Sequence, residues 1–203
     1  MSGGRKLEFD KAQALENAMY TFWKKGYAGT SLSDLTKSMG INKPSLYSTF
    51  GNKEQLFVCA AGYYQEHYAE QYVQLLHTEG LTLRERLTNY ITTICSLQYD
   101  PEKPKGCFIS CCVSEGAGET IPQKALDVIE KSRLFYEDYL RQFFCQEIDK
   151  GHLSEKIYPE AAAFFIITLL HGTAAMARAN KTFEEIKPVI LLAVDSLDYR
   201  AVD

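Results

Sequence analysis

The chain has 203 residues and a mass of 23.0 kDa, of which 46% are hydrophobic and 24% charged. These values are typical of a folded globular protein and exclude a disordered or collagen-like chain. The longest nearly apolar run, 161–170, is about half as long as a membrane-spanning helix, and the first ten residues lack the apolar stretch of a secretion signal. We therefore expect a cytoplasmic protein with no membrane partner, whose six cysteines are mostly reduced thiols and form no disulfide framework.

The net charge of −4 conceals a division along the chain. Residues 1–60 contain eight basic and five acidic residues, a net charge of +3, whereas the other 143 residues contain 14 basic and 21 acidic residues, a net charge of −7. A small positive segment on a negative body suits a domain that binds a polyanion such as DNA.

The first 51 residues predict three helices. Apolar residues at helical spacing predict a first helix over 9–25, which a glycine ends. A serine–aspartate capping box predicts a second, short helix over 31–39. A third helix over 42–50 has an asparagine cap and Pro44 in its first turn, where a missing N–H costs nothing.

The rest of the chain also follows helical spacing, with a proline-containing loop at 100–106. We expect further helices at about 52–77, 82–99, 107–116, 120–150, 159–179 and from 182 onward. Pro188 is expected to kink the last helix or mark its true start. The predicted fold class is all-α with about nine helices: an N-terminal three-helix domain over 1–51 and a C-terminal helical bundle over 52–203 for ligand binding and dimerisation.

The second and third predicted helices, joined by Gly-Ile-Asn, form a helix-turn-helix pattern after a packing helix. The third helix carries a lysine and several hydroxyl side chains on its outer face, at Lys43, Ser45, Tyr47, Ser48 and Thr49. Such groups contact phosphates and base edges, whereas this helix has no arginine or glutamine to read a base with two hydrogen bonds. The pattern predicts DNA binding without predicting the DNA sequence.

Three segments resemble the DNA-binding domain of the tetracycline-repressor (TetR) family of bacterial transcription regulators. They are Gly-Tyr-Ala-Gly-Thr-Ser-Leu at 26–32, Met-Gly-Ile-Asn-Lys-Pro-Ser-Leu-Tyr at 39–47 and Phe-Gly-Asn-Lys-Glu-Gln-Leu-Phe at 50–57. The resemblance implies phosphate contacts by Thr30, Ser31, Tyr47 and Lys53, and groove contacts by Lys43, Pro44, Ser45, Ser48 and Thr49. Simple packing of Tyr47 and a solvated surface position for Lys53 remain alternatives.

The resemblance also implies a homodimer built from the last two helices. The segment 161–179 supports this independently, because a helix that is apolar on more than one face must be buried. The candidate interface residues are Phe165, Gly172, Ala175, Ala179, Ile190, Leu191, Val194 and Leu197. The alternative is that both helices lie inside a monomer. Two-fold symmetry predicts a palindromic double-stranded DNA operator.

Aromatic residues from several helices of the bundle indicate a cavity for a small apolar or aromatic effector. The candidate lining residues are Tyr64, Tyr68, Tyr90, Phe108, Cys112, Tyr136, Phe164 and His171. Alternatively, these side chains simply fill the core. Because the fourth helix continues from the DNA-binding domain into the bundle, we hypothesise a repressor whose operator affinity is lowered by the ligand.

Cys107 suggests an alternative mechanism, the sensing of oxidants or electrophiles by a thiol. It begins a helix beside Lys103 and Lys105, and such positive surroundings favour a thiolate. Cys111, one turn later, is a candidate to resolve oxidised Cys107 as a disulfide. The competing interpretation is that both cysteines are inert.

The remaining classes of function have no supporting motif. The spacing Cys-x-x-x-Cys-Cys is not that of a zinc site, so we expect no metal. The sequence has no glycine-rich phosphate loop, serine nucleophile elbow or His-Glu-x-x-His segment. We therefore expect no enzyme activity, no catalytic residue and no cofactor.

Overall fold

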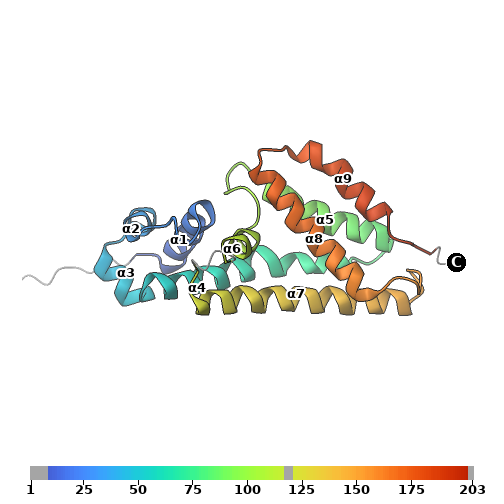
Figure 1. Ribbon diagram of the computed structural model, residues 1–203, viewed down its shortest axis with the longest axis horizontal. Coiled ribbons are helices and arrows are strands. Elements are labelled where there is room, and N and C mark those ends of the chain that lie inside the picture. Colours follow the sequence, from blue (N-terminus) through green and yellow to red (C-terminus); the bar gives the residue numbers. More distant parts are fainter. Residues whose placement is uncertain (1–8, 117–120, 201–203) are drawn as a thin grey trace, which may run out of the picture.

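The computed structural model describes residues 9–116 and 121–200, and the side chains at 69, 70 and 116 are not among the parts described. In chain order the helical segments are α1 (Lys11–Lys25), α2 (Leu32–Met39), α3 (Lys43–Phe50), α4 (Lys53–Tyr64), η1 (Gln65–Ala69), η2 (Glu70–His77), α5 (Leu83–Gln98), α6 (Phe108–Gly116), α7 (Gln123–Asp149), α8 (Pro159–Arg178) and α9 (Phe183–Asp195), as Figure 1 shows. Within the described ranges the β-structure is limited to one isolated bridge, between Leu153 and Tyr199. The all-α prediction is confirmed. Thr120, which we expected to open the seventh helix, lies outside the described residues.

Ser31 and Asn42 begin their helices where the sequence predicts, and α1 has a cap, Asp10, that we did not predict. The Asp10 side chain accepts hydrogen bonds from the backbone of the first turn of α1. Ser31 forms its reciprocal capping box at α2, and the Asn42 side chain accepts from the backbone N–H of Ser45 at α3. Gly40 ends α2 with a φ of 67°, a left-handed conformation that glycine adopts without strain.

The segment that follows α4 differs from the single helix predicted over 52–77. Regular α-helix stops at Tyr64, and the chain continues through the wider π-helical turn η1 into the tighter 3-10 helix η2. The apolar spacing continues through all three segments, so periodicity in the sequence does not reveal the change. π-Helical turns are often found at functional sites. Here the turn holds Tyr68, which lines the cavity described below.

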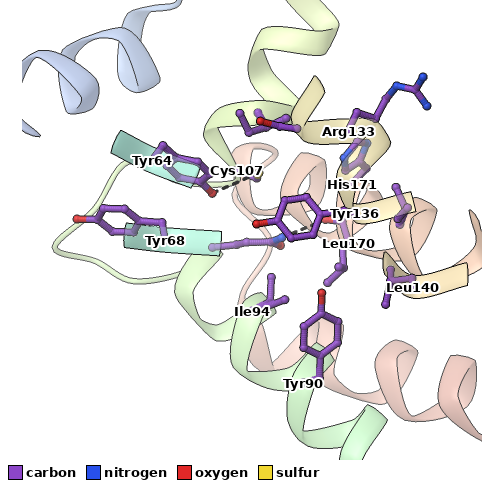
Figure 2. A pocket seen from close by; sticks show the side chains of 14 residues that line it. Tyr64, Tyr68, Tyr90, Ile94, Cys107, Arg133, Tyr136, Leu140, Leu170 and His171 are labelled. Atoms are coloured by element: carbon purple, nitrogen blue, oxygen red, sulfur yellow. Dashed lines mark hydrogen bonds between the residues drawn. The ribbon is translucent and has the colours of Figure 1, made fainter. Parts of the chain in front are cut away.

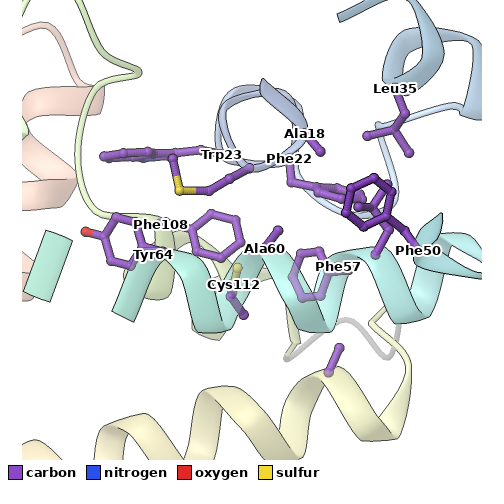
Figure 3. Close-up of a cluster of buried hydrophobic side chains, with 14 of the residues drawn as sticks. Ala18, Phe22, Trp23, Leu35, Phe50, Phe57, Ala60, Tyr64, Phe108 and Cys112 are labelled. Atoms are coloured by element: carbon purple, nitrogen blue, oxygen red, sulfur yellow. The ribbon is translucent and has the colours of Figure 1, made fainter. Parts of the chain in front are cut away.

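Two hydrophobic cores hold the molecule together, and the first extends across position 51. It combines α1–α3 with α4, α6 and the start of α7. Figure 3 shows Phe22, Phe57 and Phe108 packed in it, with ring centroids 5.0 Å apart for the first pair and 5.6 Å for the second. The second core lies among α5, α7, α8 and α9. The helices α4 and α6 thus pack in the same core as α1–α3.

The α8 helix corrects our expectation that no segment is long enough to span a membrane. It has 20 residues and is apolar enough to pass that test by length and composition. It nevertheless contacts α5, α6, α7 and α9 in the bundle, and a core helix passes the same test. We therefore assign α8 to the protein core and to the surface described below.

Pro188 lies inside α9 rather than at its start, because Thr182 caps that helix and Phe183 is its first residue. The missing N–H of the proline leaves one backbone carbonyl of the preceding turn without its helical hydrogen bond.

Candidate nucleic-acid interface and internal cavity

The outer face of α3 is available for contact with another molecule. Leu46 and Phe50 are buried and attach α3 to the first core. The remaining predicted residues of this helix are exposed or half-buried at the surface: Lys43, Pro44, Ser45, Tyr47, Ser48 and Thr49. Tyr47 is among the exposed large side chains, so it is not a packing residue in this structure. In Figure 1, α3 lies at the end of the molecule remote from α9.

The three other predicted phosphate contacts have different environments. The Thr30 side chain is only 1% exposed and its hydroxyl donates to the Gly26 carbonyl over 2.6 Å, so its proposed role is corrected to a structural one. Ser31 is exposed, although its hydroxyl bonds to Asp34. Lys53 is half-buried, with its Nζ 4.3 Å from the centroid of the Tyr27 ring, and burial lowers the pKa of its ammonium group.

Glu115 of α6 connects the bundle to the turn between α1 and α2. Its carboxylate oxygens accept hydrogen bonds from the backbone N–H groups of Tyr27, over 2.8 Å, and Ala28, over 2.6 Å. Gly26 leaves room for this carboxylate, because a Cβ there would lie 2.7 Å from a Glu115 oxygen. No motif in the sequence marks Glu115, and only the packing of α6 against α1–α2 reveals it.

An internal cavity of about 110 Å³ lies in the bundle, between α4–η1, α5, the start of α6, α7 and α8. Figure 2 shows several of its side chains, and five of the residues predicted to line a cavity do so: Tyr64, Tyr68, Tyr90, Tyr136 and His171. The lining also includes residues that we did not predict: Ile94, Gln98, Cys107, Ile109, Ser132, Arg133, Leu140, Ile167 and Leu170. In the sequence these residues have the same types and spacing as ordinary core residues, so nothing indicated that they line a cavity.

The predictions for Phe108, Cys112 and Phe164 as lining residues are wrong. Phe108 and Cys112 are buried in the first core against α4. Phe164 is 55% exposed on the outside of α8. Both α6 and α8 are apolar on more than one side, so the sequence did not indicate which side faces the cavity.

Several polar groups around the cavity are already paired. The Tyr64 hydroxyl donates to Cys107 Sγ over 3.3 Å. The Tyr68 hydroxyl lies 2.5 Å from the Tyr20 hydroxyl and donates to Glu16 Oε1 over 2.9 Å, and both partners belong to α1. Tyr68 therefore joins the cavity wall directly to the DNA-binding domain.

The cysteine cluster lacks the electrostatic surroundings that the sequence suggested. Lys103 pairs with Asp100 over 3.3 Å, and Lys105 donates to the Asn180 side chain over 2.9 Å, so both lysines have other partners. Burial raises the pKa of the Cys111 thiol to about 11, despite a hydrogen bond from Arg178. Cys107 remains accessible from the cavity. Within the described residues, no group of three or more His, Cys, Asp or Glu side chains is arranged to hold a metal ion.

An apolar surface lies on α8 and α9, and we call it the α8–α9 face. Its large exposed side chains are Phe164, Phe165, Met176, Val189, Leu191 and Leu192, and the small residues Gly172, Ala175 and Ala179 are exposed on the same two-helix unit. Ile190 and Val194 are fully buried in the second core and Leu197 packs against it, so their assignment to an interface is corrected. The sequence indicated the right helices, but two of the three residues chosen on α9, Ile190 and Val194, lie on its inner side, and Leu197 follows the end of α9.

Comparison with known proteins agrees with these features. Residues 14–59 match the family model "Bacterial regulatory proteins, tetR family", and residues 84–190 match "Tetracyclin repressor-like, C-terminal domain". The HTH-type transcriptional repressor ComR of Escherichia coli K12 is 29% identical over 191 residues, which cover 93% of this chain and 89% of ComR. The repressor BdcR of the same organism is 26% identical over 200 residues, covering 96% of this chain and 92% of BdcR.

A solved structure extends the similarity to three dimensions. A cysteine mutant of the TetR family regulator CifR, complexed with 26-bp operator DNA, has a TM-score of 0.86 and 28% identity, covering 96% of this chain and 100% of the CifR chain. The second family model alone matches more than half of the present chain. The helix-turn-helix unit, the nine α-helices of the described residues and these matches together show that the chain belongs to the TetR family of bacterial transcription regulators.

Proposed function

We propose that this protein is a cytoplasmic, homodimeric transcriptional repressor that binds a palindromic operator through α3 and releases it when a small molecule occupies the cavity. The observation that carries the proposal is Tyr68, which lines the cavity and bonds to Tyr20 and Glu16 of α1. One side chain thus lines the candidate effector site and contacts the DNA-binding domain. Relatives of similar length, ComR and BdcR, are repressors.

The contacts suggest how occupancy of the cavity would change DNA affinity. A ligand that displaces the Tyr68 ring separates its hydroxyl from α1, and movement of α6 shifts the Glu115 carboxylate that holds the α1–α2 turn. In a two-fold dimer the recognition helices must match half-sites about one DNA turn, roughly 34–36 Å, apart. A ligand that binds more tightly to a form of the dimer with a different separation of the recognition helices favours that form. It therefore lowers the affinity for the operator.

Operator binding is tested by fluorescence anisotropy on labelled DNA from immediately upstream of the protein's own gene, with excess competitor DNA. We expect tight, competitor-resistant binding. We expect Lys43→Ala to weaken binding. The slope of the logarithm of the binding constant against the logarithm of the salt concentration should fall in magnitude by about one, the effect of losing one phosphate contact. Lys131→Ala, an exposed lysine on α7, is the matched control and should leave binding unchanged. Failure to bind both this DNA and a randomised DNA pool would contradict the proposal.

The Tyr68 connection is tested with Tyr68→Phe, which removes the hydroxyl and keeps the ring. We expect faster amide hydrogen exchange in α1 around Glu16 and Tyr20, because a bond to a carboxylate contributes about 1.5–3 kcal/mol. Tyr158→Phe removes a hydroxyl from an exposed residue at the start of α8 and serves as the control. Unchanged exchange in α1 would show that Tyr68 does not restrain the DNA-binding domain.

A second candidate, thiol sensing, is favoured by the position of Cys107 Sγ in the cavity wall, where it accepts a bond from Tyr64. In this alternative, peroxide oxidises the thiol and alters the same wall. Operator affinity after mild peroxide treatment should then fall in the unmodified protein and remain constant in Cys107→Ser. An unaltered affinity of the treated, unmodified protein excludes the alternative.

A further inference from the structure

The Tyr90 hydroxyl lies at the cavity and makes no hydrogen bond with the described residues. Tyr90 is 3% exposed and extends from α5. Figure 2 shows its hydroxyl directed into the cavity, toward Ile94 and Leu170. A tyrosine hydroxyl is a protonated donor at neutral pH, and burial raises the pKa of Tyr90 further. The hydroxyl is accessible from the cavity, so it can donate to an acceptor on a bound molecule.

Three other polar side chains of the cavity, those of Tyr64, Gln98 and Ser132, are paired within the protein, whereas the Tyr90 hydroxyl is not. Tyr64 donates to Cys107, and the Gln98 amide donates to the Leu170 carbonyl and accepts from Thr173. These bonds must break before the same groups can bind a ligand. Tyr90 can form its bond without breaking another.

No charged group among the described lining residues is directed into the cavity. Figure 2 shows the Arg133 guanidinium pointing away from it, and this group pairs with Glu130 and Glu137 of the same helix. Burial lowers the pKa of His171, which keeps its imidazole neutral at pH 7. An ionic ligand would lose its hydration and find no opposite charge in exchange.

The rest of the wall consists of aliphatic side chains, such as Ile94, Leu140 and Leu170, and of tyrosine rings. We propose that the effector is a neutral, largely apolar molecule with an oxygen that accepts a hydrogen bond from Tyr90. This inference rests on the proposed function in taking the cavity as the effector site. It adds to the proposed function the charge and polarity of the effector and the residue that anchors it.

Four probes of similar size test the inference by isothermal titration calorimetry: acetophenone, ethylbenzene, benzoate and benzylammonium. Acetophenone is neutral and carries a carbonyl oxygen, whereas ethylbenzene has none and the other two are ionic. We expect acetophenone to bind most tightly, ethylbenzene to bind more weakly, and both ions to show no saturable binding. Failure of acetophenone to bind, or equal binding of either ion, overturns the inference.

Tyr90→Phe identifies the anchor, with Tyr158→Phe as a control outside the cavity. Because the lost hydroxyl has no partner in the protein, the variant should fold normally. We expect acetophenone to bind it about three- to tenfold more weakly, the effect of one hydrogen bond, and ethylbenzene to bind it unchanged. An equal change for both probes, or none for acetophenone, removes Tyr90 as the anchor.

Operator release, measured by anisotropy with the same probes, distinguishes the two proposals. Acetophenone binding that depends on Tyr90 without operator release contradicts the proposed function and supports the assignment of the ligand class. Operator release by benzoate or benzylammonium, bound in the cavity, supports the proposed function and overturns the assignment of a neutral ligand.

Discussion

Leu192→Glu is expected to convert the protein from a dimer into a 23.0 kDa monomer with at least about 100-fold weaker operator binding. Leu192 is 72% exposed in this chain and belongs to the apolar α8–α9 face, as do Val189 and Leu191. An apolar surface of this kind marks a contact between proteins. A glutamate placed in that contact loses its hydration without gaining a counter-charge. Each separated subunit then binds one half-site alone, without the gain in affinity that a linked second subunit gives by binding the other half-site.

Leu134→Glu provides the matched control, because Leu134 is also exposed but lies on α7, outside the α8–α9 face. It should remain dimeric and bind the operator normally. Sedimentation velocity gives the mass of both variants and anisotropy gives their affinity. A dimeric Leu192→Glu protein would place the subunit interface elsewhere.

Glu147→Ala is expected to destabilise the protein by about 3–5 kcal/mol, because it leaves a buried guanidinium without its counter-charge. Glu147 is 0% exposed on α7, and its carboxylate accepts from Arg86 over 2.6 Å and is also bonded to Lys150 and His152. Urea unfolding at a fixed protein concentration measures the loss. The double variant Arg86→Met, Glu147→Leu should recover much of it, since an apolar pair needs no charge balance. A loss below about 1 kcal/mol would show that water relieves the unpaired Arg86.

The same network predicts how stability depends on pH. Burial by itself raises the pKa of Glu147, but hydrogen bonds from Arg86, His152 and Lys150 outweigh it and lower the pKa to about 2. A carboxyl group whose pKa is lower in the folded state stabilises the fold fully above its unfolded value of about 4.5. This contribution is lost as the pH falls from there toward 2. The unmodified protein should therefore lose more stability than the double variant between pH 5 and pH 2.5.

The local structure of this protein was determined largely by its sequence. Capping residues such as Ser31, Asn42 and Thr82 fix where helices begin, because they satisfy N–H groups that have no partner within the helix. These signals act over three or four residues and do not depend on the rest of the fold. The helix-turn-helix motif, which consists of such signals at fixed spacing, was therefore predictable together with the exposed face of α3.

The tertiary structure decided which side of each apolar helix faces which neighbour. Phe108 and Ile190 were assigned to functional surfaces because they are apolar, yet they fill the two cores, while Leu192 is exposed. Burial of apolar area is favourable in any direction, so composition alone does not select a side. The contacts of Glu115 and Tyr68 with α1 likewise join residues far apart in the sequence. Only the packing of α4 and α6 against α1 brings them together, and the proposed connection between cavity and operator depends on that packing.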